Sequence, residues 1–266
     1  MTSADHAIGI FDSGVGGLTV LHALLEALPS EHLIYLGDTG RYPYGTKSAA
    51  TVTRYSIENV EFLVAKGIKA LVVACNTSSA VALDALAARY PLPIVGVIEP
   101  GARAAVARTR SNRVGVIGTE ATIASGAYTA ALRALRAGIE IYTRPCPLLV
   151  PLAEEGWVEG PIPRSVAETY LASLRTSGID TLVLGCTHYP LLKPVIGAVM
   201  GEAVTLVDSA EETAREVVAV LAVRGLARSG GTGTTSFFVT DVPDRFIRIG
   251  QRFLGARVDS AVRIER

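Results

Sequence analysis

The sequence is poor in several features that mark whole classes of protein. It holds three cysteines in 266 residues, and aromatic residues make up 6% of it. Lys+Arg and Asp+Glu are 25 each, so the chain lacks the basic excess that favours binding to nucleic acids or anionic membranes. No apolar run approaches the roughly 18 residues of a transmembrane helix. We therefore expect no nucleic-acid partner and no membrane span.

The first residues also lack the marks of a secretory leader. Residues 1–14, MTSADHAIGIFDSG, contain neither a basic start nor an apolar segment behind it. A cytoplasmic location is therefore expected, and in that compartment Cys75, Cys146 and Cys186 should remain free thiols. None of the three belongs to a CxxC pair, so the sequence predicts no metal site.

The abundant residues are aliphatic and point to the α/β class. Hydrophobic residues make up 49% of the chain. Apolar runs of strand length alternate with segments of helical periodicity, and near-continuous apolar strands between helices are typical of a parallel sheet covered on both faces. Strands are predicted at 7–11, 32–38, 69–75 and 93–99, with helices at 18–28, 48–66 and 79–90.

The same series then starts again about 106 to 111 residues later, with strands predicted at 113–119, 138–144, 180–186 and 203–209. We interpret this as two similar, pseudo-two-fold-related α/β domains with the active site in the cleft between them. The first would comprise 1–98 plus 210–266, because the strand and helix of the tail are expected to return to it, and the second 99–209. The simpler alternative is that any α/β protein shows recurring apolar strands.

Two cysteines occupy equivalent places in this repeat. Cys75 ends the strand of LVVACNTSSA and Cys186 ends that of LVLGCTHYPL, and each precedes an expected helix start. Ligands of parallel sheets bind beyond the carboxyl ends of the strands, and a helix N-terminus favours the thiolate. A single strand-end cysteine is usually a small core residue. The matched pair favours chemistry, whereas Cys146, between two prolines, is interpreted as structural.

Two opposed thiols suit a reaction that inverts a carbon centre. One group must remove a proton from one face of that carbon, and another must deliver a proton to the opposite face. A thiol can serve in both roles because its pKa can be tuned towards the working pH. The pair therefore predicts racemisation of an α-amino acid without a cofactor.

Five segments carry a resemblance that agrees with this reading. IFDSGVGGLTVL (10–21), YLGDTGRYPYGTKS (35–48), ACNTSSA (74–80), CPLLVPLAEEG (146–156) and GCTHYPLL (185–192) together resemble the glutamate racemases of the aspartate/glutamate racemase family. The resemblance implies interconversion of L- and D-glutamate, which supplies D-glutamate for peptidoglycan, with no cofactor and no metal. It leaves a homodimer open.

The resemblance also implies roles for individual residues. The catalytic cysteines of the family match Cys75 and Cys186, and its helpers match Asp12, His188 and an acidic residue at Glu154 or Glu155. The positions that would contact the substrate are Asp12, Ser13, Tyr44, Gly45, Asn76, Thr77, Thr187 and His188.

These residue types make chemical sense in those roles. Ser13, Asn76, Thr77 and Thr187 offer neutral donors to carboxylates, and Gly45 permits close approach of the backbone. Asp12 would act on Cys75 or on the substrate ammonium, and His188 would orient or deprotonate Cys186. The plainer reading of Asp-Ser-Gly after a strand is a turn or a helix cap, and a lone histidine more often serves packing.

Other functions remain open at this point. Gly14, Gly16 and Asp38 imitate a dinucleotide fingerprint, but Thr19 stands where its third glycine belongs. A cysteine hydrolase could pair Cys186 with His188, although an i, i+2 spacing at a strand end looks unfavourable. A glutamate-binding module and a racemase for aspartate or another amino acid are further alternatives. One CH₂ separates glutamate from aspartate, a discrimination of roughly 1–3 kcal/mol.

Overall fold

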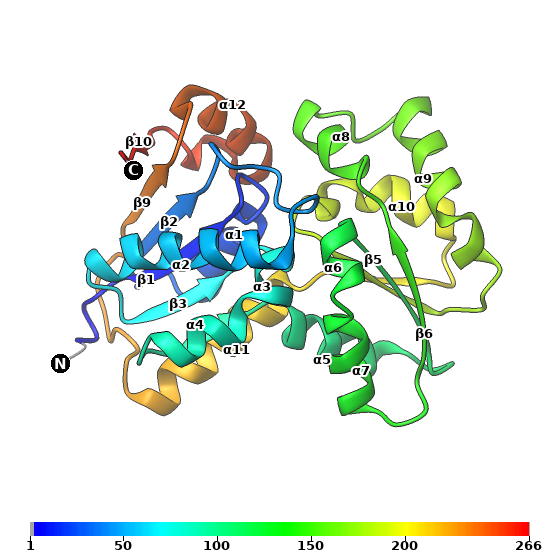
Figure 1. Ribbon diagram of the computed structural model, residues 1–266, viewed down its shortest axis with the longest axis horizontal. Coiled ribbons are helices and arrows are strands. Elements are labelled where there is room, and N and C mark those ends of the chain that lie inside the picture. Colours follow the sequence, from blue (N-terminus) through cyan, green and yellow to red (C-terminus); the bar gives the residue numbers. More distant parts are fainter. Residues whose placement is uncertain (1–2, 266) are drawn as a thin grey trace.

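The computed structural model describes residues 3–265, and its strands form two parallel sheets (Figure 1). The first sheet has the order β10-β9-β2-β1-β3-β4. It combines strands from the start of the chain with two from its end: β1 (Ile8–Asp12), β2 (Leu33–Gly37), β3 (Ala70–Val73), β4 (Ile94–Gly96), β9 (Thr235–Val239) and β10 (Val262–Arg263). The tail therefore returns to the first half, as predicted, where β9 pairs with β2.

The second sheet repeats the strand order of the first. Its order is β6-β5-β7-β8, which matches β2-β1-β3-β4 strand for strand. Its members are β5 (Arg113–Gly118), β6 (Glu140–Pro145), β7 (Thr181–Gly185) and β8 (Thr205–Val207). This confirms an α/β fold with two similar sheets, while the boundaries between the two domains stay a prediction.

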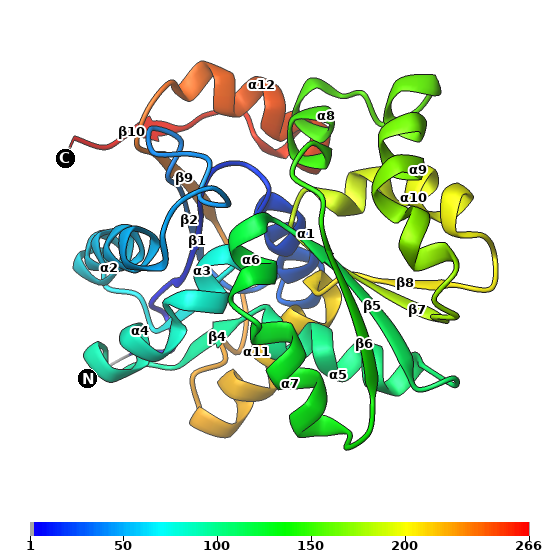
Figure 2. The same ribbon diagram turned by 45° about the vertical axis from the view of Figure 1, so that its right-hand side comes forward.

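Helices cover both faces of each sheet (Figures 1 and 2). Alternate residues of β3 show why, since Ala70 and Val72 pack into one buried cluster with α1 and α11, whereas Leu71 and Val73 pack into another with α2 and α4. The helices are α1 (Leu18–Ala27), α2 (Ala49–Ala65), α3 (Asn76–Val81), α4 (Leu83–Arg89), α5 (Ile98–Arg108), α6 (Glu120–Ala124), α7 (Ala127–Leu135), α8 (Leu149–Glu155), α9 (Pro161–Arg175), α10 (Lys193–Met200), α11 (Ala210–Arg224) and α12 (Pro243–Leu254), with 3₁₀ turns η1 (Tyr189–Leu192) and η2 (Gly255–Arg257).

Two predicted boundaries differ from the structure by three residues. The helix predicted at 79–90 begins earlier, at Asn76, and is divided at Ala82 into α3 and α4. The strand predicted at 93–99 ends at Gly96, and Ile98 already belongs to α5. One side chain accounts for the early end of β4, because the Ser79 hydroxyl donates to the Val73 carbonyl at 2.8 Å and accepts from the Val97 N–H at 3.2 Å. No helix among the described residues is long and apolar enough to cross a membrane.

A buried ion pair ties three distant segments to the start of β3. Lys69 and Glu31 are almost fully buried, and the Lys69 ammonium contacts the Glu31 carboxylate and the Ala4 carbonyl. The other carboxylate oxygen of Glu31 accepts from the Arg228 N–H at 2.8 Å. Such a pair adds little compared with apolar residues, but removal of one partner leaves an uncompensated buried charge.

Substitution Lys69→Met should lower the free energy of unfolding by about 3–5 kcal/mol, because Glu31 then stays buried without its cation. Urea denaturation followed by circular dichroism measures this difference. The double variant Lys69→Met/Glu31→Leu should recover most of the loss. A single variant as stable as the wild type would show that the pair contributes nothing.

Candidate active site

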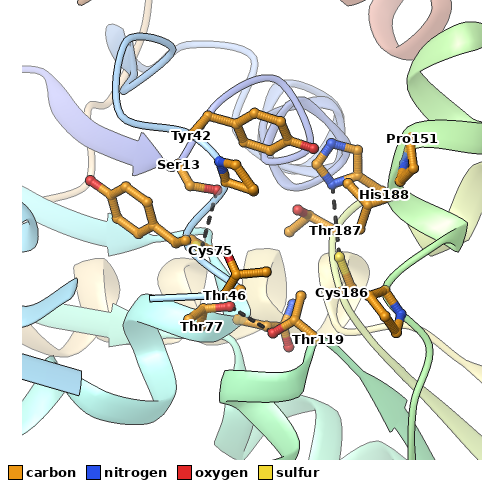
Figure 3. Close-up of a pocket in the computed structure, with 16 residues that line it drawn as sticks. Ser13, Tyr42, Thr46, Cys75, Thr77, Thr119, Pro151, Cys186, Thr187 and His188 are labelled. Carbon is orange, nitrogen blue, oxygen red and sulfur yellow. Dashed lines mark hydrogen bonds between the residues drawn. The ribbon is translucent and has the colours of Figure 1, made fainter. Parts of the chain in front are cut away.

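A cavity of about 100 Å³ lies at the carboxyl ends of the strands, between the two sheets (Figure 3). A single buried water needs roughly 10–15 Å³ of such space, so the cavity suits a small metabolite and not a dinucleotide. The lining residues come from both halves of the chain: Ser13, Tyr42, Pro43, Tyr44, Gly45, Thr46, Cys75, Asn76, Thr77, Thr119, Pro147, Val150, Pro151, Cys186, Thr187 and His188.

Cys75 occupies one wall of the cavity. It follows β3, stands at the N-cap position of α3, and is only 5% exposed. Its thiol donates to the Ser13 hydroxyl at 3.6 Å. Burial, reinforced by the nearby negative charge of Asp12, raises the pKa of Cys75 to about 11. Cys75 is therefore a thiol at neutral pH.

Cys186 lies across the cavity from Cys75, in a different electrostatic setting (Figure 3). Its Sγ is 3.7 Å from Nδ1 of His188, and Nε2 of that ring lies 3.1 Å from the Glu154 carboxylate. Burial lowers the pKa of His188, but its contacts with Cys186 and Glu154 outweigh this effect and raise the pKa to about 10. A proton held on His188 stabilises negative charge that develops on the Cys186 sulfur.

The contact between Cys186 and His188 corrects an expectation from the sequence. Side chains at i and i+2 were expected to pair poorly at a strand end. The chain has already left the extended conformation at His188, whose φ of −81° and ψ of −29° are helical, so both side chains face the cavity. The helix expected directly after Cys186 is also replaced by the 3₁₀ turn η1, with α10 beginning only at Lys193.

Asp12 does not line the cavity, although the sequence placed it among the substrate contacts. It ends β1 and is fully buried. One carboxylate oxygen accepts from the Gly14 N–H at 2.8 Å, and the other has no hydrogen-bond partner among the described residues. Burial raises the pKa of Asp12, while the charge of His188 partly offsets this. Asp12 thus acts on Cys75 through its electrostatic field and disfavours the Cys75 thiolate.

The other predicted contact residues line the cavity, and one of them presents a free donor. Asn76 accepts from the Tyr128 hydroxyl at 2.7 Å through Oδ1, while its buried Nδ2 lacks a partner among the described residues. The Tyr44 hydroxyl, in contrast, is engaged by the Asp38 carboxylate. A Cβ added at Gly45 would lie 2.6 Å from Cβ of Thr119, so only glycine fits this wall.

The structure also resolves which acidic residue is near the site. Glu154 is buried against His188, whereas Glu155 is exposed. Thr119 was missed, although it follows β5 as Ser13 follows β1, and the repeat itself pointed to that position. The remaining unexpected wall residues lie inside two motifs that carried the resemblance: Tyr42, Pro43, Thr46, Pro147, Val150 and Pro151.

The alternative dinucleotide site loses its support in the structure. The Asp38 carboxylate, which would hold a dinucleotide ribose, is buried and accepts from Arg41 Nε at 2.8 Å and from the Thr240 hydroxyl at 2.9 Å. Within residues 3–265, no cluster of three or more His, Cys, Asp or Glu side chains could hold a metal ion. Cys146 is fully buried outside the cavity, and burial raises its pKa to about 12.

The two cavity thiols should differ in reactivity at equal exposure. At pH 7 iodoacetamide should modify Cys186 first, because His188 stabilises its negative charge, while Cys75 is a thiol. Labelling of Cys75 should rise about tenfold per pH unit towards pH 11, and Asp12→Asn should accelerate it by removing a repelling charge. Peptide mass spectrometry measures both rates, with buried Cys146 as the unreactive control. Equal labelling of Cys75 and Cys186 at pH 7 would contradict this charge difference.

Comparisons with known proteins agree with this geometry. The family model for Asp/Glu/hydantoin racemases matches residues 8–217. A glutamate racemase of Geobacter metallireducens is 60% identical over 259 residues, which cover 97% of this chain and 96% of the relative. The crystal structure of a glutamate racemase isoform from Bacillus anthracis superposes with a TM-score of 0.95 at 41% identity, covering 98% of this chain and 97% of that one.

A second crystal structure holds a ligand. The glutamate racemase of Francisella tularensis, in complex with D-glutamate, superposes with a TM-score of 0.92 at 37% identity and covers 98% of both chains. Identity and coverage of this extent, together with two thiols facing one cavity, show that the chain belongs to the Asp/Glu/hydantoin racemase family, among its glutamate racemases.

Proposed function

We propose that the chain interconverts L- and D-glutamate by a two-base mechanism without a cofactor. The observation that carries the proposal is the placement of Cys75 and Cys186 on opposite walls of one small cavity (Figure 3). The D-glutamate bound to the Francisella tularensis relative supports the choice of substrate. As in that family, the product would supply D-glutamate for peptidoglycan, and the reaction would take place in the cytoplasm.

In this mechanism the α-carbon of glutamate lies between the two sulfurs. The thiolate on one side removes the α-proton, and the thiol on the other side donates its proton to the opposite face of the planar carbanion. The sulfur roles are then exchanged, and solvent restores the starting state. Cys75, which keeps its proton, would be the first acid, and Cys186, which lies against the protonated His188, would be the first base.

Neutral donors would hold the substrate without competing for its proton. The hydroxyls of Ser13, Thr77 and Thr187 and the free Nδ2 of Asn76 are suited to the two carboxylates of glutamate. An ammonium group near Asp12 would offset the charge that disfavours the Cys75 thiolate, so that the bound substrate itself would prepare the second sulfur. The roles of Asp12, His188 and Glu154 as helpers belong to this proposal.

The organisation of the chain is proposed to follow its two sheets. Residues 1–98 plus 210–266 would form the domain of Cys75, and residues 99–209 that of Cys186. The placement of β9 and β10 in the first sheet supports this division. A homodimer is a further expectation, for which oligomeric state in solution is the relevant measurement.

The proposed function is tested by circular dichroism with each enantiomer of glutamate and of aspartate, in heavy water, after dialysis against a chelator. We expect racemisation of glutamate, with solvent deuterium in the newly formed enantiomer and little label in the remaining starting enantiomer at early times. The reason is that the delivered proton comes from a second, solvent-exchanged thiol. Activity lost with the chelator, or rapid early labelling of the starting enantiomer, would contradict the two-base mechanism.

Single cysteine variants sharpen this test. Cys75→Ala and Cys186→Ala should each reduce racemisation by about 10²–10⁴-fold or more. Each should still exchange the α-proton of one enantiomer, and the exchanged enantiomer should differ between the two variants. Cys146→Ala, whose thiol is buried outside the cavity, should racemise glutamate as the wild type does.

A further inference from the structure

Helix α12, from the tail of the chain, contacts Glu154 of α8 through side chains. The tail belongs to the first sheet through β9, whereas α8 follows β6 of the second sheet. Two arginines of α12, Arg245 and Arg252, lie two turns apart on the same helical face and both reach Glu154. The contact therefore joins the two halves of the chain close to Cys186.

Glu154 is held from three directions. Its Oε1 lies 3.1 Å from Nε2 of His188, and its Oε2 accepts from Nη2 of Arg245 at 3.2 Å. Arg252 donates to the main-chain oxygen of the same residue. The Arg252 guanidinium lies 3.1 Å from where a Cβ would stand at Gly156, whose φ of 76° ends α8. Only 6% of the Glu154 surface is exposed, so these partners hold its carboxylate beside His188.

The charges in this chain of contacts alternate in sign. Burial alone would raise the pKa of Glu154, but the contacts with His188 and the charge of Arg245 lower it below its ordinary value. An ionised Glu154 in turn helps to keep the proton on His188. Arg245 is 47% exposed and touches neither the cavity nor a sulfur, so its influence on the site passes through Glu154.

We propose that Arg245 is a positioning residue for the Cys186 half of the reaction, which it serves by fixing the Glu154 carboxylate on His188. The inference rests on the proposed function. Cys75 lies on the other side of the cavity, with Ser13 as its hydrogen-bond partner, so loss of Arg245 acts first on Cys186. The two enantiomers of glutamate have equal free energy, so kcat/KM stays equal in both directions while kcat and KM change unequally.

The first experiment compares Arg245→Met with Arg248→Met. Arg248 lies on the same helix, is exposed, and makes no hydrogen bond or ion pair within the described part of the chain. Arg245→Met should lower kcat by about 10- to 100-fold, more in one direction than in the other. It should also move the acidic limb of the kcat–pH profile to higher pH, because Glu154 becomes easier to protonate. Arg245→Lys should restore much of the lost kcat and much of the wild-type pH profile.

A second measurement needs no turnover. Alkylation of Cys186 should be slower in Arg245→Met than in the wild type, because Glu154 without Arg245 holds the proton on His188 less firmly. In a Glu154→Gln background, Arg245→Met should not slow the alkylation of Cys186 further. The carboxylate through which Arg245 acts on His188 is already absent from that background. Arg245→Gln repeats the comparison should the methionine variant melt at a lower temperature than Arg248→Met.

The outcomes separate the two proposals. Rates, pH profile and alkylation identical to those of Arg248→Met would overturn the role of Arg245 and leave the racemase function untouched. A full Arg245 effect in the Glu154→Gln background would overturn it as well. Absence of racemisation by the wild type would overturn the proposed function, while the alkylation comparison would still decide whether Arg245 acts through Glu154.

Discussion

Two sulfurs face one cavity from opposite sides in different electrostatic surroundings, and the other features of the site follow from this arrangement. Parallel sheets supply the geometric half of this arrangement, because their strands all end at one edge. β3 and β7 hold the same place in two sheets of identical order, so Cys75 and Cys186 leave their strands at matching points. When the two edges face each other, so do the thiols (Figure 3).

The chemical half of the arrangement is supplied by breaking that symmetry. Around Cys75 the sequence places Ser13, a neutral acceptor, and Asp12, a buried negative charge, and the thiol keeps its proton. Around Cys186 it places His188 and Glu154, which hold a proton beside the sulfur. The proposed reaction, with equal free energies on both sides, would thus take place between two walls that are alike in fold and unlike in charge.

Some polar groups near the cavity are hydrogen-bonded within the protein, whereas another lacks a partner among the described residues. The unpartnered group supports the binding of a ligand there. Asp38 engages Arg41, Tyr44 and Thr240, and these contacts hold the segment 41–47 that forms one wall. In contrast, Nδ2 of Asn76 is buried and unpartnered among the described residues. A buried unsatisfied donor costs about 1–3 kcal/mol. A carboxylate that accepts a hydrogen bond from this donor removes the cost, which favours an acidic substrate.

Local patterns in the chain predict the α/β class, the repeat of the strands and the strand-end position of both cysteines, because apolar runs record which segments are buried. They also indicate most of the wall, since Asn76 and Thr187 directly follow the two cysteines. The folded chain was needed to show that Asp12 is not part of the wall, that the chain at His188 turns its ring onto Cys186, and that Arg245 reaches Glu154. Those features depend on a turn dihedral and on contacts across 34 and 91 residues of sequence, and such contacts leave no local pattern in a single chain.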